Sequence, residues 1–385
     1  MRFIHTSDWH LGRIFYGEHL TADQSYVLHN FLDLVADVCP QAVLIAGDIY
    51  DRAVPPVEAV ELLNEILGRL TIDLRVPVIM IAGNHDSPER VGFGNRLLAK
   101  QGLHVIGSLG KTVFPIVLED EFGPVHFVPI TYAEPSVVKV THGIDEMMNH
   151  EQAMQYLVQR AITAIPPGQR SVALAHAYIA GSEDSESERP LTVGGSGTVS
   201  YDIFRPFHYT ALGHLHKAQR AGTENIRYSG SLLKYSFSET GQQKGVYLID
   251  MDRTGNTETQ FVTLKPRRDV RCIEGYMQDL LAVPNQVIGR DDYIMANLLD
   301  EQPVLDPMGR LRQIYPNILG ANRQSIAVAT ELDGPEGDHR TLSEQELFRS
   351  FFEQITGRSL SAQENTVFCR VVEDVFRASQ EAGKR

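Results

Sequence analysis

The sequence predicts an α/β protein built as a two-sheet sandwich. Short apolar runs at Arg2–Thr6, Ala42–Ala46 and 77–82 have the composition of buried strands, and each leads directly into a polar or glycine-rich turn. Stretches with apolar residues at helical spacing separate these runs, over 26–39 and 55–70. Beyond residue 104, strands follow one another with less helix between them. Alternating strands and helices followed by runs of strands are typical of two packed layers of sheet.

The individual elements have local signals of their own. The helix over 26–39 places Val27, Phe31 and Val35 on one side, and the helix over 55–70 opens with two prolines, which favour the first helical turn. The same patterns predict a helix at 151–165 and strands at 104–106, 126–129, 171–175, 209–212, 226–229, Gly245–Met251 and 258–264.

We expect three parts along the chain: a large domain over 1–265, a small α+β domain over 266–340 and a helical pair over 341–385. The middle part has candidate strands at 270–273 and Tyr293–Leu298 and candidate helices at 276–281 and 308–315. A linker is expected at 333–338. Each terminal helix begins with a capping-box pattern, Ser343 with Glu346 and Ser361 with Glu364.

Composition excludes several classes of protein. The chain has 385 residues, of which 43% are hydrophobic and 22% charged, as in ordinary globular proteins. Neither a membrane-spanning run nor a signal-peptide pattern is present, so we expect a cytoplasmic protein. The three cysteines, Cys39, Cys272 and Cys369, form no CxxC pair, which favours buried free thiols over a disulfide framework or a structural zinc site.

The charge balance bears on nucleic-acid binding. Lys and Arg number 35 against 49 Asp and Glu, a formal net charge of −14. This argues against a protein that grips phosphate backbones over its whole surface. It leaves room for a nuclease whose carboxylates hold metal ions, or one that relies on a basic partner.

Asp, His or Asn residues, which are common metal ligands, follow directly after five of the predicted strands. Because the carboxyl ends of strands in open α/β sheets border the crevice where sites form, these side chains are expected to converge. Residues two apart on an extended chain face the same side, so Asp8 with His10, and His214 with His216, are each expected to bind one ion. The segments are Asp8-Trp9-His10, Gly47-Asp48-Ile49-Tyr50-Asp51, Gly83-Asn84-His85-Asp86, Ala175-His176-Ala177 and Gly213-His214-Leu215-His216.

The donor set is sufficient for two ions. Two carboxylates, four imidazoles and one amide suit Mn²⁺, Fe or Zn²⁺ better than Ca²⁺ or Mg²⁺. Asp48 is able to bridge two ions about 3.5–4 Å apart, and such a pair would clamp a phosphate and activate water. His85 remains for contact with the phosphate or protonation of the leaving oxygen. The proposed ligands are Asp8, His10, Asp48, Asn84, His176, His214 and His216.

The ordered set DxH, GDxxD, GNHD, a lone His and GHxH resembles the calcineurin-like metallophosphoesterase superfamily. The flanking segments HTSDWHLG, AGDIYDRAVPP, IAGNHDSPER, ALGHLHKAQ and YSGSLLKYSFSE are similar to its SbcD branch of bacterial nucleases. The motifs cover roughly residues 1–240. The resemblance implies a metallophosphoesterase sandwich with a small capping domain over 266–340.

The resemblance also implies roles for the residues. One metal would be held by Asp8, His10, Asp48 and His216, and the second by Asp48, Asn84, His176 and His214, with His85 as the catalytic histidine. Some archaeal relatives have a second histidine three residues after the bridging aspartate, where this chain has Asp51. Asp51 is therefore expected to orient a ligand rather than to bind metal, and Asp86 is a further candidate for the same role.

The activity implied is manganese-dependent cleavage of DNA, as an exonuclease on duplex ends and an endonuclease on single strands and hairpins. The partners implied are an SbcC-type ATPase, held by 341–385, and a second copy of the chain, held through helices near 55–98. Lys217, Arg227 and Lys234 are candidate phosphate contacts, and Trp9 is expected to pack in the core. Two alternatives stay open: a phosphoesterase acting on small molecules or proteins, and a scaffold that holds DNA ends without catalysis.

Overall fold

The structure is a computed structural model. Its described part divides into two compact units, Met1–Cys272 with Asp291–Tyr293, and Ile273–Arg290 with the chain from Ile294 onward. The residues described are 1–146, 148–191, 197–282, 289–300, 302–323, 348–349, 352–353, 358–368 and 370–371.

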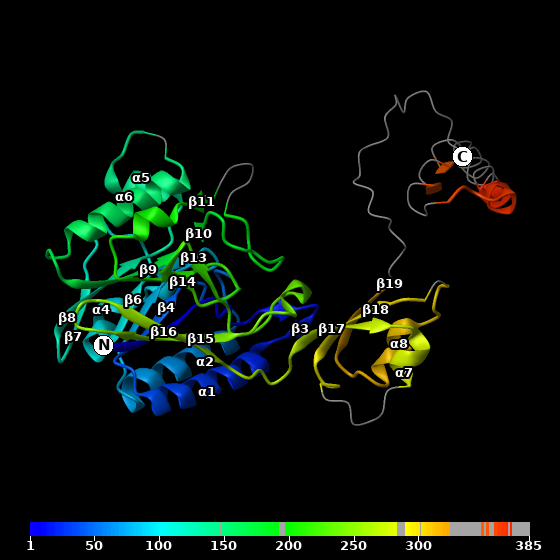
Figure 1. The fold of residues 1–385 in the computed structure, drawn as a ribbon, viewed down its shortest axis with the longest axis horizontal. Coiled ribbons are helices and arrows are strands. Elements are labelled where there is room, and N and C mark those ends of the chain that lie inside the picture. Colours follow the sequence, from blue (N-terminus) through cyan, green and yellow to red (C-terminus); the bar gives the residue numbers. More distant parts are fainter. Residues whose placement is uncertain are drawn as a thin grey trace, which may run out of the picture. The chain divides into compact units, whose positions relative to one another are not determined.

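The first unit contains two six-stranded sheets (Figure 1). In the first sheet the order is β16-β15-β1-β4-β5-β6; β1, β4, β5 and β6 run parallel, and β15 and β16 complete it in antiparallel pairing. The strands are β1 (Arg2–Thr6), β4 (Ala42–Ala46), β5 (Val78–Ile81), β6 (Leu103–Ile106), β15 (Gly245–Met251) and β16 (Thr257–Thr263).

The second sheet has the order β13-β14-β12-β9-β8-β7. Its four central strands are parallel, and β13 and β7 pair antiparallel at the two edges. The strands are β7 (Ile116–Asp120), β8 (Gly123–Ile130), β9 (Arg170–His176), β12 (Tyr209–Gly213), β13 (Gln219–Ala221) and β14 (Thr223–Tyr228). Two short pairs, β2 (Ile14–Phe15) with β3 (Glu18–His19) and β10 (Tyr178–Ile179) with β11 (Thr198–Val199), lie outside the two large sheets.

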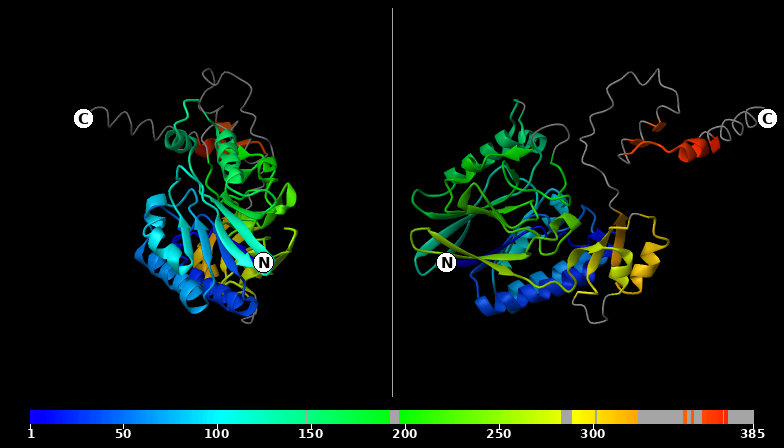
Figure 2. Two further views of the ribbon diagram at one scale, coloured as in Figure 1. Left: turned by 90° about the vertical axis from the view of Figure 1, so that its left-hand side faces the viewer. Right: turned by 45° about the vertical axis from the view of Figure 1, so that its right-hand side comes forward.

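Helices cover the outer faces of the sandwich. In the views of Figures 1 and 2, α1 and α2 lie side by side along the first sheet, and α5 and α6 lie beyond the second. The helices are α1 (Thr21–Val38), α2 (Val57–Gly68) with a π-turn at Arg69–Asp73, α3 (Pro88–Val91), α4 (Asn95–Leu98), α5 (Pro135–His142) and α6 (His150–Thr163). Short 3₁₀ turns occur at Ala99–Gln101, Tyr201–Phe204 and Phe237–Glu239.

The core between the sheets follows from the period-two alternation of strand side chains. Phe3 faces inward from β1, and its ring meets those of Phe127 and Tyr209 edge-on, each at 5.7 Å between centroids. Ile4, the next residue, is equally buried but belongs to the opposite face of the strand. Because both faces of β4 and β5 are covered, the sequences of these two strands, AVLIA and VIMI, are apolar throughout.

The second unit has its own small core. Its sheet has the order β17-β18-β19, and Ile294, Ala296 and Leu311 are completely buried in the cluster that packs there. The elements are β17 (Val270–Gly275), α7 (Met277–Leu281), β18 (Tyr293–Leu298), α8 (Pro307–Arg312) and β19 (Ile318–Arg323), of which the first residues of β17 and β18 are counted with the first unit.

The two-sheet α/β sandwich is confirmed. Several elements were not predicted, among them β7, α5 and β19. Of the predicted elements, α1 begins at Thr21, five residues before the predicted start, because the apolar spacing on which the prediction depended begins only with Val27. The capping box at Ser361 is present, since Ser361 and Glu364 exchange hydrogen bonds between side chain and backbone. Ser343, Glu346 and the expected linker at 333–338 lie outside the described residues.

The prediction of buried thiols is wrong for two cysteines. Cys39 is exposed because it ends α1 in a left-handed conformation with φ 46°, and Cys272 is exposed on β17, an edge strand of its three-stranded sheet. Cys369 lies outside the described residues. Among the residues that the structure describes, no helix combines the length and apolar character needed to cross a membrane.

Candidate metal centre

All seven predicted metal ligands meet at one end of the sandwich. Each follows or ends a parallel strand: β1, β4 and β5 of the first sheet, and β9 and β12 of the second. Because these strands run in the same direction within each sheet, their carboxyl ends share an edge. Six of the seven side chains are at least 97% buried, namely Asp8, His10, Asp48, His176, His214 and His216.

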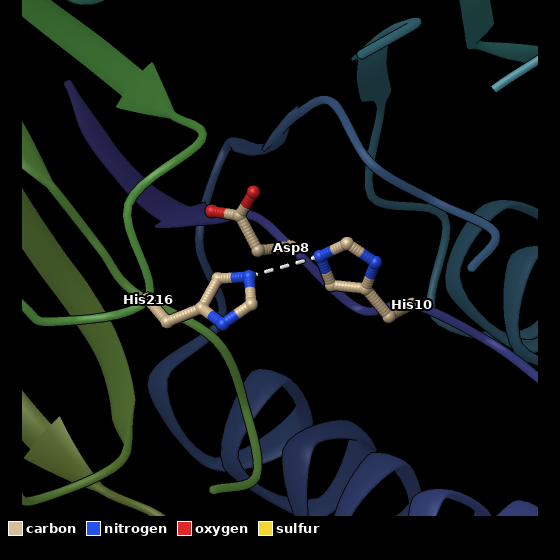
Figure 3. Close-up of side chains that lie close together, drawn as sticks. All are labelled: Asp8, His10 and His216. Atoms are coloured by element: carbon tan, nitrogen blue, oxygen red, sulfur yellow. Dashed lines mark hydrogen bonds between the residues drawn. The ribbon is translucent and has the colours of Figure 1, made fainter. Parts of the chain in front are cut away.

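One cluster consists of Asp8, His10 and His216 (Figure 3). The Nε2 atoms of His10 and His216 lie 3.0 Å apart. Metal–nitrogen bonds of about 2.0–2.1 Å bring two ligand nitrogens to this kind of separation. The Asp8 carboxylate is fixed by Ser7 Oγ, 2.5 Å from Oδ2, and by the N–H of His214, 2.9 Å from Oδ1.

A second cluster consists of Asp48, His176 and His214, with Asn84 beside them. Asn84 Oδ1 lies 2.8 Å from His176 Nε2 and 3.1 Å from His214 Nδ1. The other ring nitrogen of His176 lies 2.9 Å from the carbonyl oxygen of Ala46, which orients the ring and leaves Nε2 facing the cluster.

Asp48 joins the two clusters. Its Oδ2 lies 3.7 Å from His10 Nε2 and 3.5 Å from His176 Nε2, and its Oδ1 accepts the N–H of His85 at 2.9 Å. A buried carboxylate between imidazoles of both clusters is a suitable bridge. Carboxylate, imidazole and amide donors that converge in a buried site fit divalent cations.

The backbone at the site differs from the expected extended form. Asp8, His10 and Asp48 have φ between 46° and 54°, and His214 has φ 111°. His214 lies in the cluster with Asp48 and His216 in the cluster with Asp8. This matches the assignment that the family resemblance implies, and it differs from the pairing that the spacing of the two histidines suggests. Left-handed conformations of residues other than glycine are costly and gather at functional sites, where the surrounding fold maintains them.

Two glycines allow the loops to approach this closely. A Cβ at Gly213 would overlap the carbonyl oxygen of Ala46, and one at Gly83 would overlap the backbone and carboxylate of Asp48. The glycine in each motif is therefore required by packing between neighbouring strand ends.

Burial and neighbouring charges act on the pKa values of the cluster. Burial alone would raise the pKa of Asp48, but His176 and His10 outweigh it and hold that pKa well below its usual range. Burial lowers the pKa of His214 to about 3 and also that of His10. Burial raises the pKa of Asp8 to about 6. The Asp48 carboxylate in turn outweighs the effect of burial on His176 and raises the pKa of that ring to about 9, so a metal ion at His176 Nε2 would have to displace a proton.

His85 lies beside the first cluster, half-buried, with its ring 4.7 Å from that of His10. Its Nδ1 lies 2.8 Å from the carbonyl oxygen of Asp51, which leaves Nε2 for other contacts. The Asp51 carboxylate lies 3.6 Å from His10 Nδ1 and accepts a hydrogen bond from Arg13 at 2.9 Å. Asp51, His10 and His85 thus form a third group whose ligand atoms lie close enough together to hold a cation, and the positive charge of Arg13 opposes a cation there.

Asp86 supports the same loops from behind. Its two oxygens accept the backbone N–H groups of Ile49, Tyr50 and Gly83 at 2.9–3.1 Å. The expectation that Asp86 orients ligands fits this position, although it acts on the main chain that carries them.

The sequence did not reveal a group of residues behind His216. Ser187 Oγ lies 2.5 Å from His216 Nδ1 and also contacts Glu239, whose carboxylate pairs with Lys244 at 2.6 Å. These residues are separated in sequence and belong to none of the five motifs. The glutamate within YSGSLLKYSFSE was the only available signal.

The other predicted contacts have internal partners. Lys217 pairs with Glu183, Arg227 with Glu224 and Lys234 with Asp269. Trp9 is 1% exposed and its indole N–H donates to Thr6 Oγ1, which confirms the packing role.

Two family models match the chain. The one described as Calcineurin-like phosphoesterase matches residues 1–218, and the one described as Type 5 capsule protein repressor C-terminal domain matches residues 266–356. Among solved structures, a dimetal phosphatase from Danio rerio shares 13% identity at a TM-score of 0.40, over 69% of this chain and 99% of its own.

Two curated relatives match almost the whole chain. The SbcD subunit of nuclease SbcCD from Staphylococcus saprophyticus is 32% identical over 385 residues, 100% of both chains. Its counterpart from Staphylococcus epidermidis is 34% identical over 361 residues, 94% of this chain and 95% of its own. Divalent-metal binding follows from the phosphoesterase family and the buried ligand clusters together. The chain therefore belongs to the calcineurin-like phosphoesterase family and, within it, to the SbcD subunits of SbcCD nucleases.

Proposed function

We propose that this chain is the dimetal nuclease subunit of an SbcC–SbcD-type complex, cleaving DNA as a duplex-end exonuclease and a single-strand and hairpin endonuclease. The observation that carries the proposal is the pair of buried ligand clusters joined by Asp48, in a chain that matches its SbcD relatives from end to end. A role in DNA repair and recombination follows from that activity.

The proposed site holds two divalent ions, most suitably Mn²⁺. Asp8, His10, Asp48 and His216 would hold the first, and Asp48, Asn84, His176 and His214 the second. Bound there, the ions would neutralise charge on a phosphodiester and lower the pKa of the attacking water.

The chain itself supplies the acid–base group. His85 donates from Nδ1 to the Asp51 carbonyl, so its Nε2 is available to contact a phosphate oxygen and to protonate the leaving oxygen. The main-chain carbonyl of Asp51 keeps the ring in that orientation, and Arg13 binds the carboxylate of the same residue.

The ATPase partner is proposed to bind the terminal helices of 341–385. Among the described residues there, Phe348 and Phe368 stack at 3.8 Å and line an apolar groove with Phe352. Val367 and Val371 are 63% and 54% exposed beside it. An apolar groove on helices suits an amphipathic helix of a partner. We keep the domain boundaries 1–265, 266–340 and 341–385 as part of this proposal, with 266–340 capping the DNA.

A homodimer is proposed through 55–98. Val57, Phe93 and Leu97 expose 67%, 84% and 75% of their surface there. Large apolar side chains at such exposure are typical of interfaces. Replacing Phe93 and Leu97 together by glutamate should convert a dimer into a monomer in light scattering of the purified chain. A wild-type chain that is monomeric at micromolar concentration would refute this part.

The decisive experiment is cleavage of a labelled DNA hairpin by the purified chain with Mn²⁺, alone and with an SbcC-type partner and ATP. The wild type should give endonucleolytic products. His85→Ala should keep the fold and both ions but give none, and cleavage by that variant would remove His85 from the mechanism. Hydrolysis of a simple phosphodiester without any DNA cleavage would favour the small-molecule or protein phosphoesterase. Binding of DNA ends with neither activity would favour the scaffold.

The partner assignment has its own test. Deleting 341–385 should abolish association with the ATPase while Mn²⁺-dependent hydrolysis of simple phosphodiesters continues. A complex that still forms would refute the role of these helices.

A further inference from the structure

His216 differs from His176 in how its remote ring nitrogen is held. The Nδ1 of His176 lies against a main-chain carbonyl, at Ala46. The Nδ1 of His216 lies 2.5 Å from the hydroxyl of Ser187. Ser187 belongs to a loop that precedes His216 by 29 residues in the sequence. The orientation of His216 therefore depends on side chains.

The proton positions in this contact follow from the acceptors. Ser187 Oγ also contacts Glu239 Oε1, and an ionised carboxylate only accepts hydrogen bonds. The hydroxyl proton of Ser187 therefore points to Glu239, and its oxygen accepts the Nδ1–H of His216. This fixes the tautomer of His216 that leaves a lone pair on Nε2, the atom 3.0 Å from His10 Nε2.

Glu239 is itself held as an ion. Its side chain is completely buried, and the Lys244 ammonium lies 2.6 Å from Oε2. Lys244 also donates to the carbonyl oxygen of His216 at 2.7 Å and to Ser231 Oγ at 3.0 Å. The ion pair thus contacts both the side-chain support and the main chain of His216.

The loop that carries Ser187 is fixed at two further points. Glu188 Oε1 accepts the backbone N–H of His216 at 2.7 Å. Arg13 donates to the Ser187 carbonyl oxygen at 3.3 Å while its other terminal nitrogen donates to Asp51. The loop is therefore connected both to the backbone of His216, through Glu188, and to its side chain, through Ser187.

We propose that Ser187, oriented by the buried Glu239–Lys244 pair, is a positioning residue that holds His216 in its metal-binding tautomer. The inference rests on the dimetal site proposed above and adds to it a loop that controls the affinity of the first ion. Removal of a group that orients a ligand histidine typically weakens metal binding by about 10–100-fold.

The test is Mn²⁺ binding to the full-length chain, by calorimetry and by electron paramagnetic resonance of free Mn²⁺. Ser187→Ala should weaken the binding of one of the two Mn²⁺ ions by about 10–100-fold and leave the affinity for the other near the wild-type value. Ser187→Thr keeps the hydroxyl and should restore binding. Glu183→Gln is the matched control, since Glu183 lies on the same loop, is 71% exposed and pairs with Lys217. Wild-type affinity for both ions in Ser187→Ala would overturn the inference.

A second readout separates this inference from the dimetal site. Nitrogen NMR of histidine-labelled, metal-free chain, with the His216 signals assigned by His216→Gln, should show a proton on Nδ1 in the wild type. Ser187→Ala should shift His216 toward a mixture of tautomers, and Glu183→Gln should not. If the wild type binds fewer than two Mn²⁺, the dimetal proposal fails, whereas an unchanged tautomer in Ser187→Ala refutes the positioning role alone.

Discussion

The carboxylate of Asp86 accepts the backbone N–H of Tyr50 at 2.9 Å. The same carboxylate accepts from Ile49 and from Gly83. It therefore joins the loop after β4, which carries Asp48, to the loop after β5, which carries Asn84. One buried acid sets the distance between two ligand-bearing loops.

Asp86→Asn should lower both stability and metal affinity. An amide has one acceptor oxygen and turns two donors toward backbone N–H groups, so at least one buried N–H loses its partner. An unsatisfied buried donor costs about 1–3 kcal/mol in the free energy of unfolding. Urea denaturation of the metal-free chain measures this loss, and Mn²⁺ titration of the same variant measures the change at the site.

The control for this variant is Asp73→Asn, because Asp73 forms an exposed pair with Arg69. Its unfolding free energy should stay within about 0.5 kcal/mol of the wild type. An Asp86→Asn chain as stable as that control would show that the three N–H groups find other acceptors.

Acid sensitivity should arise partly from Asp120. Two hydrogen bonds from Arg170 hold the pKa of this carboxyl well below its usual range, with the Met1 amino group also 2.8 Å away. A carboxyl with a lowered folded-state pKa contributes stability above its unfolded value, about 3.9, and this contribution falls as the pH drops toward the folded value.

Asp120→Asn should therefore lower the free energy of unfolding most at neutral pH. Removing one partner of a buried pair costs about 3–5 kcal/mol. The difference in unfolding free energy between wild type and variant should shrink as the pH falls below about 4. Denaturant unfolding at several pH values measures it, with the exposed Asp250→Asn as control. A difference independent of pH would assign the loss to packing instead.

Much of the fold and of the site was predictable from local patterns. The strand Ala42–Ala46 is apolar because both faces are covered, and the Gly47-Asp48 that follows marks its carboxyl end. Residue type and position relative to the strand ends were enough to collect all seven ligand candidates.

The remaining features depend on tertiary contacts. His214 and His216 lie in different clusters, and His214 has φ 111°, whereas the period-two spacing of an extended chain places them on one side. The family resemblance, and not the spacing, indicated their separation. Ser187, Glu239 and Lys244 meet behind His216 only after β9, β12 and β15 are in place, so no local pattern connects them. Cys39 is exposed because the helix ends at it.

The contact between His5 and Tyr209 should stabilise the packing of the two sheets. His5 is completely buried, with Nδ1 3.0 Å from the Tyr209 hydroxyl and Nε2 3.0 Å from the carbonyl oxygen of Leu212. Tyr209→Phe leaves Nδ1 without a donor and should cost about 1–3 kcal/mol in thermal or urea unfolding. Tyr26→Phe, at a 42% exposed position, should change little. Equal stability of both variants would mean that the ring packing, and not the hydrogen bond, carries the contact.

Metal removal should lower the melting temperature, and most of this effect should depend on Asp48. A ligand that binds only the folded state adds about 2.7 kcal/mol at one hundred times its dissociation constant. The comparison is the melting temperature in Mn²⁺ against that in a chelator, taken within each variant so that effects on the metal-free fold cancel. Because Asp48 contacts histidines of both clusters, Asp48→Asn should lose nearly the whole shift. A substitution at His216 should lose only part of the metal-dependent shift in melting temperature, and Asp250→Asn should keep all of it. An Asp48→Asn chain that still gains the full wild-type shift would show that Asp48 does not bridge the two clusters.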